Sequence, residues 1–144
     1  MNANATSLRD TLIEGFRYDA WANARWDAVL AEWPNETAHR WRLHLANAKR
    51  TWLTRFDGQD HTERSETEVD AAWIAVVAEL DLDEALEYRT LSGVPFTQPN
   101  HEIVRHVINH GTYHRGQLRM LAEIDGIAWP ETDLIFFSRE QSAR

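Results

Sequence analysis

Apolar residues recur every three or four positions along most of the chain, which is the spacing of one face of an α-helix. The first such segment follows Ser7, a residue type that caps helices, and ends before Pro34. Two further segments keep this periodicity over residues 36–56 and 68–80. The polar residues 59–67 between them indicate a loop. The pattern therefore predicts three amphipathic helices in the first part of the chain.

The pattern changes before the longest helical segment. Residues 88–97 lose the helical periodicity, and Ser92-Gly93 separates two short β-prone runs, so we predict a small hairpin or an extended crossover there. We expect Asn100 to cap a long fourth helix that ends near Gly126. The pattern therefore predicts an all-α fold, a four-helix bundle with a short irregular or hairpin connection before the last long helix and a C-terminal tail.

Length and charge narrow the class of protein. The 144 residues fit one domain with a single core, and no repeat, low-complexity tract or linker divides residues 1–144. No apolar run is long enough to cross a bilayer, and the N-terminus has no signal-peptide pattern, so we expect a cytoplasmic protein with no membrane partner. The net charge of -8 argues against a protein that holds nucleic acid by neutralising phosphates.

The C-terminal tail contains the apolar run from Leu134 to Phe137, which must be covered by the bundle or by a second chain. The 7 tryptophans are also more than so short a chain usually needs for packing. Because dimers are the commonest closed assembly, these two features predict a homodimer.

Three histidines, His106, His110 and His114, recur every four residues along the predicted fourth helix. At about 100° per residue, His110 and His114 lie within roughly 20° of the centre of its apolar face, whereas His106 lies roughly 60° away. Two imidazoles at positions i and i+4 can reach one cation, but such a pair can also be hydrogen-bonded core residues. Because the chain has no cysteine, a metal here must use imidazole, carboxylate or water ligands.

A third histidine ligand must come from another helix, and the second helix offers His39 and His44. By helical geometry His44 lies on the flank of that helix, about 80° from the centre of its apolar face. This position is compatible with reaching the fourth helix, but the spacing leaves the choice open. We expect His61, in the polar loop, and His101, in the first turn of the fourth helix, to be surface residues.

Polar residues near these histidines have several possible roles. Gln117 lies roughly 40° from the histidine line and could contact a metal-bound water or ligand, or cap a neighbouring helix. The Arg115 side chain points about 120° away from the apolar face of the fourth helix, which favours an ion pair between helices or between subunits. Asn23 could hydrogen-bond between helices.

Residues 110–117, which read H-G-T-Y-H-R-G-Q, closely resemble the signature near the end of DinB-like (DNA-damage-inducible) proteins. The resemblance extends over nearly the whole chain, through residues 18–23, 44–52, 88–93 and 130–135. It implies a four-helix bundle that binds a divalent metal ion through three histidines. Zinc and nickel both accept three imidazole ligands, so we expect one of these two metals. It selects His44 over His39, so that the implied ligands are His44, His110 and His114. It favours a role for His106 behind the ligands or in the wall of a pocket.

The resemblance also implies a function, a metal-dependent enzyme that uses a low-molecular-weight thiol as an S-transferase or isomerase. Because the protein has no cysteine, the thiol would come from outside and the metal would present it as thiolate. One alternative is a metal-water hydrolase, but no Glu or Asp lies within the H-x-x-x-H segment to act as its base. Another is a non-catalytic metal-binding stress-response protein. The sequence does not indicate a catalytic residue. It also does not indicate the identity of the thiol or of the other small-molecule substrate.

Overall fold

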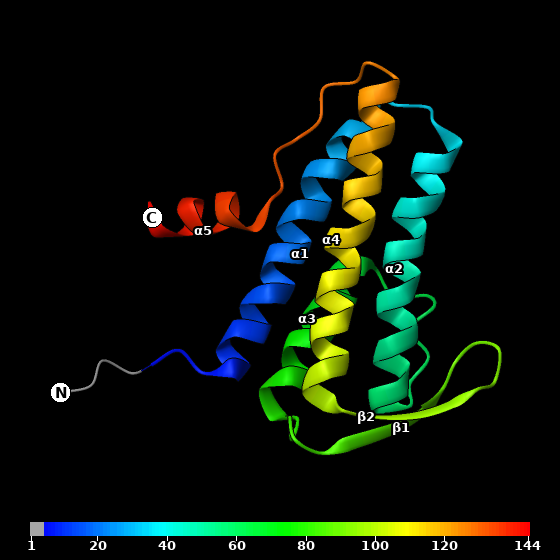
Figure 1. Cartoon of the computed structure of the whole chain (residues 1–144), viewed down its shortest axis with the longest axis vertical. Coiled ribbons are helices and arrows are strands. Elements are labelled where there is room, and N and C mark those ends of the chain that lie inside the picture. The colour runs from blue at the N-terminus through cyan, green and yellow to red at the C-terminus, as the bar shows by residue number, and fades with distance from the viewer. Residues whose placement is uncertain (1–4) are drawn as a thin grey trace.

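The computed structural model describes residues 5–144, which form five helices and a short β-hairpin. Four long helices make a bundle in which α4 packs against both α1 and α2, and α3 packs against the same two helices (Figure 1). An antiparallel hairpin precedes α4 and lies across the end of the bundle where α2 ends (Figure 1). The elements are α1 (Leu8–Leu30), α2 (Glu36–Asp57), α3 (Glu66–Glu79), β1 (Ala85–Arg89), β2 (Pro95–Pro99), α4 (Asn100–Ile124) and α5 (Leu134–Ser142). The predicted bundle and the predicted hairpin are both confirmed.

Short polar side chains begin the first three helices. Ser7 and Asp10 form a reciprocal capping box at the start of α1, and Ser65 forms a second one with Glu68 at the start of α3. This second box explains why α3 starts earlier than its apolar pattern predicted. Asn35 caps α2 by accepting a hydrogen bond from the backbone N–H of Ala38 at 3.0 Å. These contacts satisfy backbone donors that have no partner within the helix.

The expectation that Asn100 caps the fourth helix is wrong. Pro99, the last residue of β2, occupies the cap position, and Asn100 is the first helical residue. The Asn100 side-chain amide instead donates a hydrogen bond to the carbonyl oxygen of Asp81 at 2.8 Å, and its backbone N–H donates to Glu84 at 2.8 Å. Asn100 therefore ties the start of α4 to the loop that follows α3.

Aromatic side chains form much of the bundle core. The Phe16 ring of α1 stacks on Trp73 of α3, with the ring centroids 4.9 Å apart. The Trp73 indole donates a hydrogen bond to the carbonyl oxygen of Lys49 at 3.1 Å, which joins α3 to α2. Near the other end of the bundle Trp26 and Leu118 are buried in a second cluster. The Trp73 and Trp26 rings exclude water from these apolar layers while the N–H group of each indole keeps a hydrogen-bond partner.

The C-terminal helix α5 projects from the side of the bundle and packs on α1 (Figure 1). Phe137 is buried against Tyr18 and Trp21. Of the apolar run 134–137, which we expected to be covered by the bundle or by a second chain, the bundle therefore covers Phe137 alone. The remaining residues of this run stay exposed to solvent on the outside of α5: Leu134, Ile135 and Phe136.

No helix within residues 5–144 is both long enough and apolar enough to cross a membrane.

Candidate metal centre

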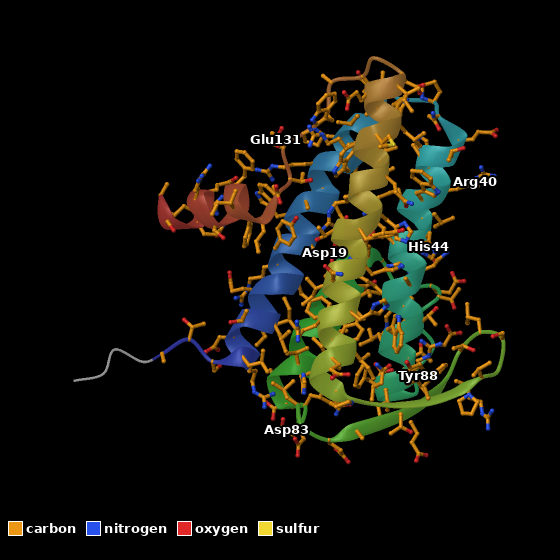
Figure 2. The ribbon with its side chains drawn as sticks, viewed as in Figure 1. Asp19, Arg40, His44, Asp83, Tyr88 and Glu131 are labelled. Atoms are coloured by element: carbon orange, nitrogen blue, oxygen red, sulfur yellow. The ribbon has the colours of Figure 1, made fainter. Side chains whose placement is uncertain are left out.

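Two helices bring three histidines together in the middle of the bundle. His110 and His114 lie one turn apart on α4, and His44 lies opposite them on α2, where Figure 2 labels it. The Nε2 atom of His110 is 3.2 Å from Nε2 of His44 and 3.1 Å from Nε2 of His114. One ligand atom of each residue lies within 4.8 Å of the others. The structure thus assembles the three histidines that the resemblance implied.

The two Nε2–Nε2 distances from His110 match the separation expected between two ligands of a tetrahedral cation. A zinc ion with Zn–N bonds of 2.0–2.1 Å would place two of its nitrogen ligands about 3.3 Å apart. The three imidazole rings are steeply inclined to one another, with angles of 63° to 82° between their planes. Because one ligand atom of each histidine lies within 4.8 Å of the others, this group could hold a metal ion.

The environment favours the neutral form of two of these imidazoles, those of His110 and His44. Burial lowers the pKa of His110 to about 4, and the neighbouring rings of His114, His44 and His106 add to this effect. Partial desolvation, together with the nearby His114, also lowers the pKa of His44, although its side chain is still reached by solvent. The neutral imidazole is the form that binds metals, so both side chains would be ready to bind at neutral pH.

Gln117 fixes the orientation of His114. The His114 Nδ1 atom donates a hydrogen bond to the Gln117 side-chain oxygen, with 2.5 Å between the two atoms. Because that oxygen can only accept, the proton lies on Nδ1 and the lone pair of Nε2 faces His110. This contact gives Gln117 a role other than the two considered from the sequence. Gln117 supports His114 from behind, on the side of the ring that faces away from His110.

His106 lies outside the three-histidine group. Its ring centroid is 5.5 Å from that of His110 and 5.5 Å from that of Trp52. Burial lowers the pKa of His106. His106 therefore stands between the histidine group and an aromatic side chain of α2.

The model of the DinB family matches residues 1–144. The chain belongs to the DinB family. A comparison with curated proteins finds no match, and neither does a comparison with solved structures. Family membership confirms the resemblance carried by the H-G-T-Y-H-R-G-Q segment.

The remaining histidines of this DinB family protein lie away from the centre. His39 is exposed, with Nε2 2.7 Å from the carbonyl oxygen of Trp33. The expectation that His61 is a surface residue is wrong, because His61 is only 1% exposed. Its Nε2 atom lies 2.7 Å from the Asp57 carboxylate, so the loop after α2 folds back over the helix end. His101 is half-buried rather than a fully exposed residue.

A buried ion cluster lies next to the histidines, and Asp19, Lys49 and His110 line the same small internal gap. The Asp19 carboxylate accepts hydrogen bonds from Arg115 Nη1 at 2.6 Å and from Lys49 Nζ at 3.0 Å. Burial favours a raised pKa for Asp19, but Lys49 and Arg115 outweigh it and hold this pKa below its usual value. The predicted inter-helix ion pair of Arg115 is thus confirmed, between α4 and α1.

The periodicity of α4 placed Arg115 far from its apolar face, yet its side chain is buried. The reason is that α4 contacts α1 as well as α2, so two of its faces are covered. The Asn23 side-chain oxygen accepts a hydrogen bond from Arg115 Nη1 at 2.9 Å, which confirms the predicted inter-helix role of Asn23. Gly111 provides the space, because a Cβ atom there would meet the Asp19 carboxylate and lie 2.8 Å from Arg115.

Asp19 and Lys49 are not among the site residues predicted from the sequence. Lys49 is buried on the inner side of α2, where its Nζ atom also contacts Asp70 at 2.6 Å and Glu66 at 2.7 Å. A charged residue between Leu45 and Trp52 in an apolar helix face was the available signal, since buried charges require partners.

Proposed function

We propose that this DinB family protein binds one divalent metal ion, zinc or nickel, through His44, His110 and His114. The observation that carries the proposal is the convergence of three imidazole nitrogens from two helices within 4.8 Å of one another. Three neutral imidazoles form the ligand set of catalytic sites, which leave a coordination position open, rather than of closed structural sites. The affinity order of divalent metals does not choose between zinc and nickel here.

We further propose that the open position receives the sulfur of an external low-molecular-weight thiol, in an S-transferase or isomerase. A bound divalent cation would lower the pKa of such a thiol and favour its thiolate form. His44 is exposed, which supports access from solvent. The protein's own residues would hold the cation, orient His114 through Gln117 and keep His110 neutral.

A specific contact favours the thiol reaction over a metal-water hydrolase. A hydrolase of this kind needs a carboxylate free to accept a proton from the attacking water. Asp19 is the carboxylate that shares an internal gap with His110, but Arg115 and Lys49 engage both of its oxygens. Because these cations also hold its pKa low, Asp19 is a poor general base.

Metal analysis of protein purified without added metal tests the binding step. We expect about one zinc or nickel ion per chain in the wild type, and loss of this ion in the His114→Ala variant with helical content retained. His106→Ala is the matched control on the same helix, and it should keep the metal. Stoichiometric metal in His114→Ala would exclude the ligand assignment, while loss in His106→Ala would make His106 a ligand.

Cobalt-substituted protein tests the thiol step. A thiolate that enters the coordination sphere of cobalt produces a charge-transfer band in the near ultraviolet, whereas water and carboxylates do not. We would titrate the cobalt protein with glutathione, bacillithiol and mycothiol, using His110→Ala as the control. A saturable band with one thiol, absent from the variant, is the expected result. The absence of any band, with metal-dependent hydrolysis of an activated ester, would favour the hydrolase. If neither the band nor the hydrolysis is observed, the result would favour a non-catalytic metal-binding protein.

A further inference from the structure

A pocket of about 390 Å³ opens between the β-hairpin and the end of α2. Its walls include Trp52 and Arg55 from α2 and Tyr88, Phe96 and Gln98 from the hairpin. Figure 2 labels Tyr88 beside the last turns of α2. The three histidines do not line this pocket, so it is a separate feature of the molecule.

The hairpin register creates the aromatic walls. Tyr88 of β1 pairs with Phe96 of β2, and Leu86 pairs with Gln98. Because side chains alternate between the two faces of a strand, these four residues share one face of the hairpin. The Tyr88 ring lies 6.1 Å from that of Phe96 and 5.0 Å from that of Trp52. The hairpin and α2 therefore present three aromatic rings to one space.

Arg55 brings a positive charge to these walls. Its guanidinium lies over the Trp52 ring, 4.1 Å from the centroid, and 5.2 Å from the Tyr88 centroid. Its Nη2 atom donates a hydrogen bond to the carbonyl oxygen of Arg89 at 2.9 Å. Throughout residues 5–144, no carboxylate forms an ion pair with Arg55. Burial without a counter-ion lowers the pKa of Arg55. An anion from outside would supply the missing charge.

Gln98 adds a neutral hydrogen-bond donor. The Tyr88 hydroxyl donates to the Gln98 side-chain oxygen, which fixes the orientation of the amide. Gln98 lines the pocket. Its side-chain nitrogen donates to no acceptor within the part of the chain that the structure describes. The pocket thus offers N–H donors from both α2 and the hairpin.

We propose that this hairpin pocket binds the carboxylate end of the protein's small-molecule substrate, an organic acid with a flat apolar body. The planar guanidinium of Arg55 matches the geometry of a carboxylate, and a single cation suits a single negative charge. The aromatic walls suit an aromatic or unsaturated body, which can pack against rings face to edge or face to face.

The pocket lies close enough to the three histidines for one substrate to reach both. This part of the inference rests on the proposed function. Trp52 lies against His106, which in turn lies against His110, so one row of rings joins the pocket to the ligands. Trp52 follows His44 by eight residues on α2, which corresponds to a rise of about 12 Å. A molecule that fills the pocket and also reaches the histidines must therefore be about 12 Å long.

Binding of 2-naphthoate to the metal-free protein tests the pocket itself. Isothermal titration calorimetry should detect binding to the wild type, with at least about tenfold weaker binding of neutral 2-naphthamide. Arg55→Gln should weaken 2-naphthoate binding by about tenfold or more, and Arg55→Lys should restore part of the loss. The matched control is Arg40→Gln, which removes the same charge at the opposite end of α2 (Figure 2) and should leave binding unchanged.

Equal binding of the acid and the amide would overturn the proposal, and so would an equal loss in Arg40→Gln and Arg55→Gln. Absence of 2-naphthoate binding to both the metal-free and the zinc-loaded protein would also overturn it. The result is separable from the proposed function. Arg55-dependent binding without any thiol band in the cobalt protein would retain the pocket and reject thiol coordination, whereas the reverse pattern would reject the pocket alone.

Discussion

The Nδ1 atom of His114 lies 2.5 Å from the side-chain oxygen of Gln117, which follows it by three residues on α4. This contact places the ring proton on Nδ1 and directs the free lone pair of Nε2 toward His110. A residue that is not itself one of the three histidines therefore decides which nitrogen of His114 is available for a cation.

We expect Gln117→Leu to weaken metal binding by about 10–100-fold, because His114 would lose the acceptor that holds its ring proton and orientation. Gln117→Glu keeps an acceptor oxygen at the same position and should bind metal close to the wild-type affinity. Competition with a chromophoric zinc chelator would measure both variants. Wild-type affinity in Gln117→Leu would show that the hydrogen bond has no role in the site.

Gly111 should be sensitive to the addition of a single methyl group. A Cβ atom there would meet the Asp19 carboxylate and the Arg115 guanidinium, which are both buried and cannot move without breaking their pair. We expect Gly111→Ala to lower the free energy of unfolding by about 1–3 kcal/mol. Urea denaturation would measure this loss.

Gly116 on the same helix is the matched control for this prediction. Apart from the nearby backbone of its own helix, a Cβ atom at Gly116 would meet nothing within 4 Å. Gly116→Ala should stabilise the protein by up to about 1 kcal/mol, because alanine favours the helical conformation. The two substitutions should therefore have opposite signs, and the same sign for both would contradict the prediction.

Asp19 should make the stability depend on acid pH. Despite its burial, Lys49 and Arg115 hold the pKa of Asp19 below its usual value of about 3.9. A carboxylate with a lowered folded-state pKa contributes stability above its unfolded-state pKa, and this contribution is lost as the pH falls through the folded-state pKa. The free energy of unfolding should therefore decrease below about pH 4. Urea titrations at several pH values would show this decrease.

Asp19→Asn should cost about 3–5 kcal/mol at neutral pH, because it leaves buried cations without their partner, and it should flatten the acid decrease. Asp70→Asn is the comparison. Burial and the nearby carboxylates of Asp19 and Glu66 raise the pKa of Asp70 by more than Lys49 lowers it. Its ionised form therefore costs stability as the pH rises, so Asp70→Asn should be the milder substitution. A larger loss in Asp70→Asn would contradict this account.

We propose that the protein forms a homodimer through the apolar surface of α5. Leu134, Ile135 and Phe136 are 54%, 51% and 39% exposed, which is a poor arrangement for a solitary chain in water. Light scattering at micromolar concentration should give twice the mass of one chain, and Ile135→Lys should give the mass of one chain with its helical content retained. Leu91→Lys, at a 91% exposed apolar position on the hairpin, should stay dimeric. A wild type with the mass of one chain would reject the homodimer.

The features that depend only on neighbouring residues could be predicted from the amino-acid sequence. The apolar period predicted the helices, Ser7 marked the start of α1, and Ser92-Gly93 marked the turn of the hairpin. The four-residue spacing placed His110 and His114 on one helix face. These predictions succeed because helical periodicity, capping and turns are set within a few residues of the chain.

The tertiary structure decided which side chains from different elements meet. The spacing left His39 and His44 both open, and the packing of α2 on α4 brings His44 to the pair. It buries Arg115 against Asp19, since α1 covers a second face of α4. The tertiary packing also buries His61, which belongs to the loop after α2. Periodicity gives the direction of a side chain around its own helix, but the rotation and offset between packed helices depend on the whole set of interlocking side chains.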